Sequence, residues 1–224
     1  MGIAVTRGGA RWSKSLQAIL LLAVTGAACG GAKHQTANAP AAAARGGSPV
    51  AAGTPAVAAL IPAGQFGGGW ARAAAPASLG DLRCAGQPLV REAGAGAEAT
   101  YSKGEAGPWA AERIVRAADG GPAAFARLAT LLQNCHRLQA PAPADGAIEW
   151  SLAPLPFPRL ADDSLALRLI SMDKARPLAA DLVLFRHGDT VALVAQFATP
   201  PGPVSGTTLA LVQQAEARLL RFLP

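Results

Sequence analysis

The chain is poor in the residues that most often build catalytic, metal or nucleic-acid sites. Aromatic residues make up 5% of its 224 residues and charged residues 15%, and there are only three histidines and three cysteines. The histidines, His34, His136 and His187, lack the spacing of metal ligands. Neither an H-E-x-x-H motif nor a G-x-S-x-G turn occurs. We therefore expect no metal, no cofactor and no catalytic residues, and interpret the chain as a non-enzyme.

Acidic residues are absent from the first 28 positions, where three of the basic residues lie. The formal net charge of +6 therefore overstates the charge of the rest of the chain, which has 17 basic and 14 acidic residues, a net charge of +3. The basic residues that remain are dispersed, and no basic stripe alternates with aromatic residues. This pattern indicates a solvated surface, and we expect no nucleic-acid partner.

No apolar run is long enough to span a bilayer, which takes about 20 residues in a helix. The most apolar run lies within residues 15–28, with Ala18-Ile19-Leu20-Leu21-Leu22-Ala23-Val24 at its centre. A basic segment precedes it and small residues follow it, in the order of a signal peptide. We predict a signal peptide over residues 1–28 that exports the rest of the chain.

Gly26, Ala27 and Ala28 stand directly before Cys29. Small residues before a cysteine resemble a lipobox, which implies cleavage before Cys29 and a diacylglycerol on its sulfur. Two acyl chains of the palmitate type, at about 0.8 kcal/mol per buried methylene, give stable anchoring. Gly26 stands where a lipobox usually has leucine. The alternatives are ordinary cleavage near Ala27 or Ala28, which gives a freely secreted protein, and an uncleaved membrane anchor.

Large apolar residues are almost missing between Gly30 and Ala58, where Ala, Gly, Pro, Ser and Thr dominate. Such a segment buries too little surface to offset its ordering entropy. We predict a lipidated cysteine and disordered tether over residues 29–58, with a reach of roughly 30 Å. A globular domain is expected over residues 59–224, beginning where Leu60-Ile61-Pro62 brings large apolar residues back.

Within the domain, apolar periodicity predicts mainly strands and two long helices. Phe125, Leu128, Leu132 and Cys135 recur at helical spacing after Gly121-Pro122, and a second helix is expected over residues 207–222 with Ser205 as its cap. The expected strands are residues 70–73, 97–103, 109–116, 147–152, 164–171, 180–186 and 190–197. The pattern predicts one α+β domain: an antiparallel β-sheet with helices packed on one face.

With Cys29 assigned to the lipid, Cys84 and Cys135 remain. In an exported protein two such cysteines are expected to form a disulfide. The alternative is a reactive Cys135 with His136 as its base, for which adjacent helical positions about 100° apart are poorly placed.

Several residues are candidates for ligand binding, each with a structural alternative. Aromatic residues line a cleft or pack in the core. The acidic pair serves acid–base chemistry or cation binding, or else caps a turn and strand. Arginines on apolar strands hold an anionic ligand or reach to an exposed face. These candidates are Trp70, Tyr101, Trp109, Asp162, Asp163, Arg168 and Arg186.

The domain resembles the PknH-like extracellular sensor-domain family, found on mycobacterial kinases and on actinobacterial lipoproteins. The likeness covers residues 59–223 and rests on four features: Leu60-Ile61-Pro62-Ala63-Gly64 followed by Gly67-Gly68-Gly69-Trp70, the two domain cysteines, residues 160–168 leading into a strand, and residues 181–197 before a closing helix. It implies an α+β sheet domain with a ligand cleft outside the cell. The kinase members carry two disulfides, and this chain has cysteines for only one.

These observations together predict a non-catalytic, ligand- or partner-binding domain, lipid-anchored at the extracytoplasmic face of the cell membrane. The expected partners are the membrane, through the lipid, and a small molecule, a lipid or an envelope protein. The alternatives are an envelope lipid carrier, which needs a large apolar cavity, an exported hydrolase with an unusual site, and a structural lipoprotein without a pocket.

Overall fold

The structure, a computed structural model, describes residues 55–90, 96–142 and 146–223. They belong to a unit that extends over Gly46–Pro224. The predicted signal peptide, Cys29 and most of the predicted tether lie outside the described residues. None of the helices described is both long enough and apolar enough to cross a membrane.

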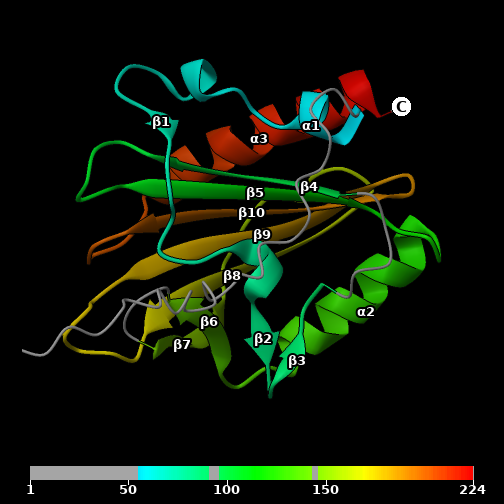
Figure 1. Cartoon of the computed structure of the whole chain (residues 1–224). Helices are drawn as coiled ribbons and strands as arrows, with labels where there is room; N and C mark the ends of the chain where they lie inside the picture. The colour runs from blue at the N-terminus through cyan, green and yellow to red at the C-terminus, as the bar shows by residue number, and fades with distance from the viewer. Residues whose placement is uncertain (1–54, 91–95, 143–145, 224) are drawn as a thin grey trace, which may run out of the picture. The chain divides into compact units, whose positions relative to one another are not determined.

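The strands form one antiparallel sheet of ten, in the order β1-β4-β5-β10-β9-β8-β7-β6-β2-β3 (Figure 1). The predicted antiparallel sheet of an α+β domain is thereby confirmed, and each expected strand is present. The strands are β1 (Ala71–Arg72), β2 (Arg83–Cys84), β3 (Gln87–Pro88), β4 (Gly96–Ser102), β5 (Trp109–Arg116), β6 (Leu138–Ala142), β7 (Gly146–Pro154), β8 (Asp163–Ser171), β9 (Ala179–His187) and β10 (Thr190–Ala198).

The two central strands, β9 and β10, are apolar on both faces of the sheet. Successive side chains of a strand point to opposite faces. Leu182 and Leu184 accordingly join one core cluster, whereas Val183 and Phe185 join another. The sheet therefore has a hydrophobic core on each side, and each core needs a covering layer.

Helices supply both layers. Helix α2 (Gly121–Gln133) packs on the first face, while α1 (Pro55–Ala59) and α3 (Ser205–Phe222) pack on the second (Figure 1). The sequence led us to expect helices on one face only. That placement is wrong because strands that are apolar on both sides cannot leave one of them to water. We call the two sides the α2 face and the α3 face.

Two short 3-10 helices, η1 (Ala63–Phe66) and η2 (Leu79–Asp81), complete the described elements. The last residues expected of the tether, from Pro55 on, form helix α1, and its Ala56 and Ala59 are buried in the core of the α3 face. Helix α3 starts with Ser205 itself, and Val204 occupies the cap position without a side-chain hydrogen bond, so the predicted serine cap is absent.

The disulfide between Cys84 and Cys135 is present, as predicted. Cys84 lies in β2, and Cys135 follows the last turn of α2. The bond fastens the two-residue strand β2, near the edge of the sheet, to the helix of the α2 face.

Candidate ligand-binding site at the β9–β10 turn

Three of the predicted site residues come together beside the β9–β10 turn. The Arg186 guanidinium donates hydrogen bonds to Asp163 Oδ2 at 2.6 and 3.0 Å and to Asp162 Oδ2 at 3.0 Å. The register of β8 against β9 explains the first pair, since Asp163 stands directly opposite Arg186. The positive charge of Arg186 is therefore matched inside the protein, and this side chain does not present a free cation to a ligand.

Asp162 also fixes the turn itself. Its Oδ2 accepts the backbone N–H of Gly188 at 2.9 Å. This hydrogen bond, aided by the charges of Arg186 and His187, holds the pKa of Asp162 below its ordinary value. The carboxyl group therefore stays ionised at neutral pH, which its ion pair with Arg186 requires. A general acid, by contrast, has to be protonated at that pH.

A row of three polar side chains crosses the sheet at the same end. Thr190, the first residue of β10, is the register partner of Arg116 on β5 and of His187 on β9. All three belong to the α3 face, because they continue the alternation of Ile114 and Phe185 along their strands. None of the three side chains makes a hydrogen bond or ion pair with any described residue.

This row lines a hollow that we call the turn hollow. Its walls are Arg116, His187, Gly188, Asp189, Thr190 and, from the end of α3, Leu223. Water-sized molecules can reach about 180 Å³ inside it. The carboxylate of Asp189 is partly engaged, since its Oδ1 accepts the N–H of Gly121 at 3.2 Å. The turn hollow therefore combines an open volume with hydrogen-bonding groups that the fold leaves unused.

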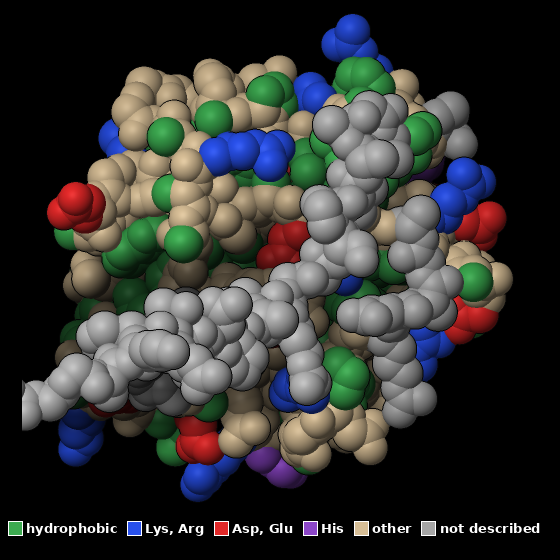
Figure 2. All heavy atoms as spheres, viewed as in Figure 1, with side chains coloured by type: hydrophobic (Ala, Val, Ile, Leu, Met, Phe, Trp, Pro, Cys, Tyr) green, Lys and Arg blue, Asp and Glu red, His purple; other side chains and the backbone are tan. Residues whose placement is uncertain are grey.

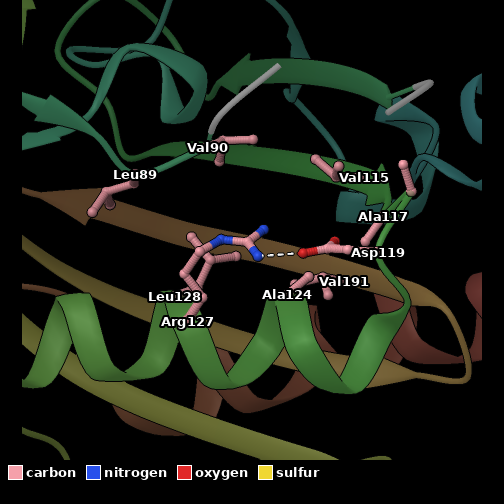
Figure 3. Close-up of a pocket in the computed structure, with 10 residues that line it drawn as sticks. Leu89, Val90, Val115, Ala117, Asp119, Ala124, Arg127, Leu128 and Val191 are labelled. Carbon is pink, nitrogen blue, oxygen red and sulfur yellow. Dashed lines mark hydrogen bonds and ion pairs between the residues drawn. The ribbon is translucent and has the colours of Figure 1, made fainter. Parts of the chain in front are cut away.

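A second hollow lies on the α2 face, between α2, β5 and residues 89–90 (Figure 3). Figure 3 shows apolar side chains around it and the ion pair between Arg127 and Asp119 across it. The hydrogen bond from Arg127 lowers the pKa of Asp119. Its volume is only about 30 Å³, roughly the share of one water molecule in the liquid. This volume is far below the large apolar cavity that a lipid carrier needs.

The structure does not gather the predicted aromatic residues into one cleft. Tyr101 is fully buried and Trp70 half-buried in the core of the α3 face, both stacked on Phe66, at ring-centroid distances of 4.4 and 5.1 Å. Trp109 packs on the core of the α2 face. Arg168 lies apart from the turn and forms an ion pair with Asp181. The predicted aromatic side chains therefore lie in two separate hydrophobic cores, and the structure does not bring all three together.

Sequence reasoning singled out Arg186 and its acidic partners but missed Arg116, Thr190 and His187 as a group. The sequence does indicate one of these neighbours. Gly188 and Asp189 form a two-residue hairpin turn, and this turn places His187 opposite Thr190. Arg116 could not be added, because the pairing of β5 with β10 joins segments far apart in the chain.

Charges of both signs are interspersed over the surface that Figure 2 presents. Within the described ranges, no group of three or more His, Cys, Asp or Glu side chains is arranged to hold a metal ion.

No protein-family model matches this chain, and no curated protein matches it. Among solved structures, the fold is similar to that described as the crystal structure of the extracellular domain of PknH from Mycobacterium tuberculosis. The TM-score is 0.55 and the sequence identity 11%, over 73% of this chain and 94% of that chain. The expected PknH-like fold is confirmed, and a likeness at this identity concerns the fold alone.

Proposed function

We propose that this chain is a non-catalytic lipoprotein, anchored at the extracytoplasmic face of the cell membrane through Cys29, whose domain binds a ligand in the turn hollow. The observation that carries the binding proposal is the unused row of Arg116, Thr190 and His187. Thr190 is a largely buried residue whose hydroxyl makes no hydrogen bond with any described residue, so this group stays available at the wall of the hollow. A ligand in the hollow would accept a hydrogen bond from it.

The anchoring proposal rests on the sequence before residue 30. A basic segment, a short apolar run and small residues before Cys29 favour export and lipidation. Two features of the described domain agree with an oxidising compartment outside the cytoplasm: the disulfide and the likeness to a domain described as extracellular.

Metabolic labelling with an alkyne analogue of palmitate tests the anchor in a bacterial host. We expect wild-type chain to take up the label and to sediment with membranes. Cys29→Ala should lose the label, whereas the control Cys84→Ala should keep it. An unlabelled wild-type chain, or one that keeps its first methionine and stays in the cytosol, contradicts the proposal.

Native mass spectrometry of the full chain, purified in mild detergent and exposed to envelope extract, tests the binding site. Arg116→Trp places a bulky, uncharged side chain at an exposed wall position of the turn hollow. Arg137→Trp is its matched control, because Arg137 is also an exposed arginine and lies outside the hollow. A bound molecule retained by wild type and by Arg137→Trp but lost by Arg116→Trp supports the proposal. Equal retention by both variants, or no bound molecule at all, contradicts it.

A further inference from the structure

We propose that the turn hollow recognises an oxyanion, a phosphate or carboxylate group of a small molecule. This inference deepens the proposed function and rests on it. Arg116 offers a guanidinium, Thr190 a hydroxyl and His187 an imidazole, and all three can donate hydrogen bonds. Oxyanions are acceptors with several lone pairs, and charge-assisted hydrogen bonds from such donors are the strong ones.

The arginine in the wall of the hollow differs from its neighbours in having no ion-pair partner among the described residues. Arg186, next to it, is neutralised by Asp162 and Asp163, and Arg127, on the opposite face, by Asp119. Arg116 has no such partner among the described residues. Asp189 is the acidic side chain of the hollow wall, and the N–H of Gly121 already occupies its Oδ1. The wall of the hollow therefore holds a guanidinium that no described acidic side chain pairs, and it is free to bind an anion.

The geometry holds the donors in fixed positions. Thr190 is paired with Arg116 on one side and His187 on the other, so the three Cα atoms lie in one row across β5, β10 and β9. Neighbouring strands lie about 4.8 Å apart, so the row is close to 10 Å wide at the backbone. Side chains from its ends can close on one phosphate or carboxylate group above Thr190.

The size of the hollow limits the rest of the ligand. About 180 Å³ accommodates an anionic group with a short attachment, which is less than the roughly 300–1,000 Å³ of a site for a drug-sized molecule. Leu223 adds one apolar side chain to the wall. The ligand class is therefore a small phosphorylated or carboxylated molecule whose larger part remains outside the hollow.

Equilibrium dialysis of the full chain in detergent against radiolabelled inorganic phosphate, and separately against acetate, tests this inference at constant ionic strength. We expect saturable binding of at least one anion, at one site per chain. Arg116→Gln should weaken binding about tenfold or more, because it removes a charge-assisted contact. Thr190→Val, which keeps the side-chain shape, should weaken it about threefold or more through the lost hydroxyl. Arg137→Gln removes the same charge elsewhere and should leave binding unchanged.

Binding of phosphate alone identifies a phosphate-bearing ligand, and binding of acetate alone a carboxylate. The inference is overturned if neither anion binds, or if Arg116→Gln binds as wild type does while its circular dichroism is unchanged. Failure of the proposed function is distinguishable. If a molecule from envelope extract binds the wild type and not Arg116→Trp, but neither anion binds, the oxyanion inference is wrong and the proposed function stands. If neither the extract nor the anions give any binding, both are wrong.

Discussion

Arg168 on β8 and Asp181 on β9 stand directly opposite each other and form an ion pair in which the carboxylate is completely buried. Thr208 of α3 donates its hydroxyl to Asp181 Oδ2 at 2.9 Å, and the carbonyl of Pro203 accepts a hydrogen bond from Arg168 at 3.4 Å. Two sheet residues thereby hold the start of α3 and the loop before it.

Removing Arg168 should destabilise the domain more than removing any surface arginine. Arg168→Met leaves the Asp181 carboxylate buried without its counter-ion, at a cost of about 3 kcal/mol in the free energy of unfolding. Urea denaturation monitored by circular dichroism measures this cost. The control Arg127→Gln breaks an ion pair whose side chains are about half exposed, and should cost no more than about 1 kcal/mol. Equal costs for the two variants would show that the buried pair has no special role.

Loss of the disulfide should weaken the domain by a comparable amount. The bond joins residues 51 positions apart, for which the chain-entropy model gives about 4 kcal/mol. Since β2 pairs with β6 and β3 over only two residues each, we expect the amides of residues 83–88 to exchange faster in the Cys84→Ala/Cys135→Ala variant. Hydrogen exchange with mass spectrometry checks this, with β9 amides as the internal reference. Unchanged exchange over residues 83–88 would contradict the anchoring role of the bond.

Sequence patterns predicted the central strands well because their signals are long and local. Strands β9 and β10 are nine-residue apolar segments around a two-residue turn, and β5 was predicted with the bounds it has. Strand β6 was not predicted, since Pro141 interrupts a five-residue segment that borders β2 for only two residues. Its pairing partners, rather than its own composition, make it a strand.

Helix α1 was also not predicted, because its sequence resembles a disordered segment. Its five residues, PAVAA, have the same Ala- and Pro-rich composition as the segment that the sequence predicts to be a tether. They are ordered by the α3 face, where Arg218 donates hydrogen bonds to the carbonyls of Ala58 and Ala59. Such contacts join residues about 160 positions apart. The row of Arg116, Thr190 and His187 was not predicted for the same reason, because the register between distant strands decides which side chains become neighbours.

Glu112 on β5 should make the stability of the domain depend on pH. Burial raises the pKa of Glu112 from 4.5 to about 7, although the N–H of Ile61, donated to its Oε2 at 2.8 Å, and the charges of Arg218 and Arg72 act in the opposite direction. Because the pKa of Glu112 is higher in the folded state than its ordinary value, folding favours the protonated carboxyl group. The resulting contribution to the free energy of unfolding is complete below about pH 4.5 and is lost as the pH rises through about 7.

Glu112→Gln keeps an amide oxygen for Ile61 but cannot ionise. Between pH 5 and pH 8 the wild type should therefore lose up to about 3 kcal/mol of unfolding free energy relative to this variant. Urea denaturation at a series of pH values provides the measurement. The exposed Glu105→Gln is the control and should follow the wild-type profile. A Glu112→Gln profile parallel to wild type would show that Glu112 does not titrate in this range.

Gly121, the first residue of α2, has no room for a side chain. A Cβ at this position would lie 2.0 Å from the carbonyl oxygen of Gly188 and 2.8 Å from the Cα of Asp189, both backbone atoms of the β9–β10 turn. Gly121→Ala should therefore push α2 and the turn apart, at a cost of about 1–3 kcal/mol. Thermal unfolding measures the loss as a lower Tm.

Gly206 provides the matched control, because it lies in the first turn of α3 and a Cβ there would meet nothing within 4 Å. Gly206→Ala should raise the stability by up to about 1 kcal/mol through the lower entropy of the unfolded chain. Since the turn forms one wall of the turn hollow, Gly121→Ala should also weaken anion binding, whereas Gly206→Ala should leave it unchanged. A Gly121→Ala variant as stable as wild type would mean that the contact between α2 and the turn is looser than its geometry requires.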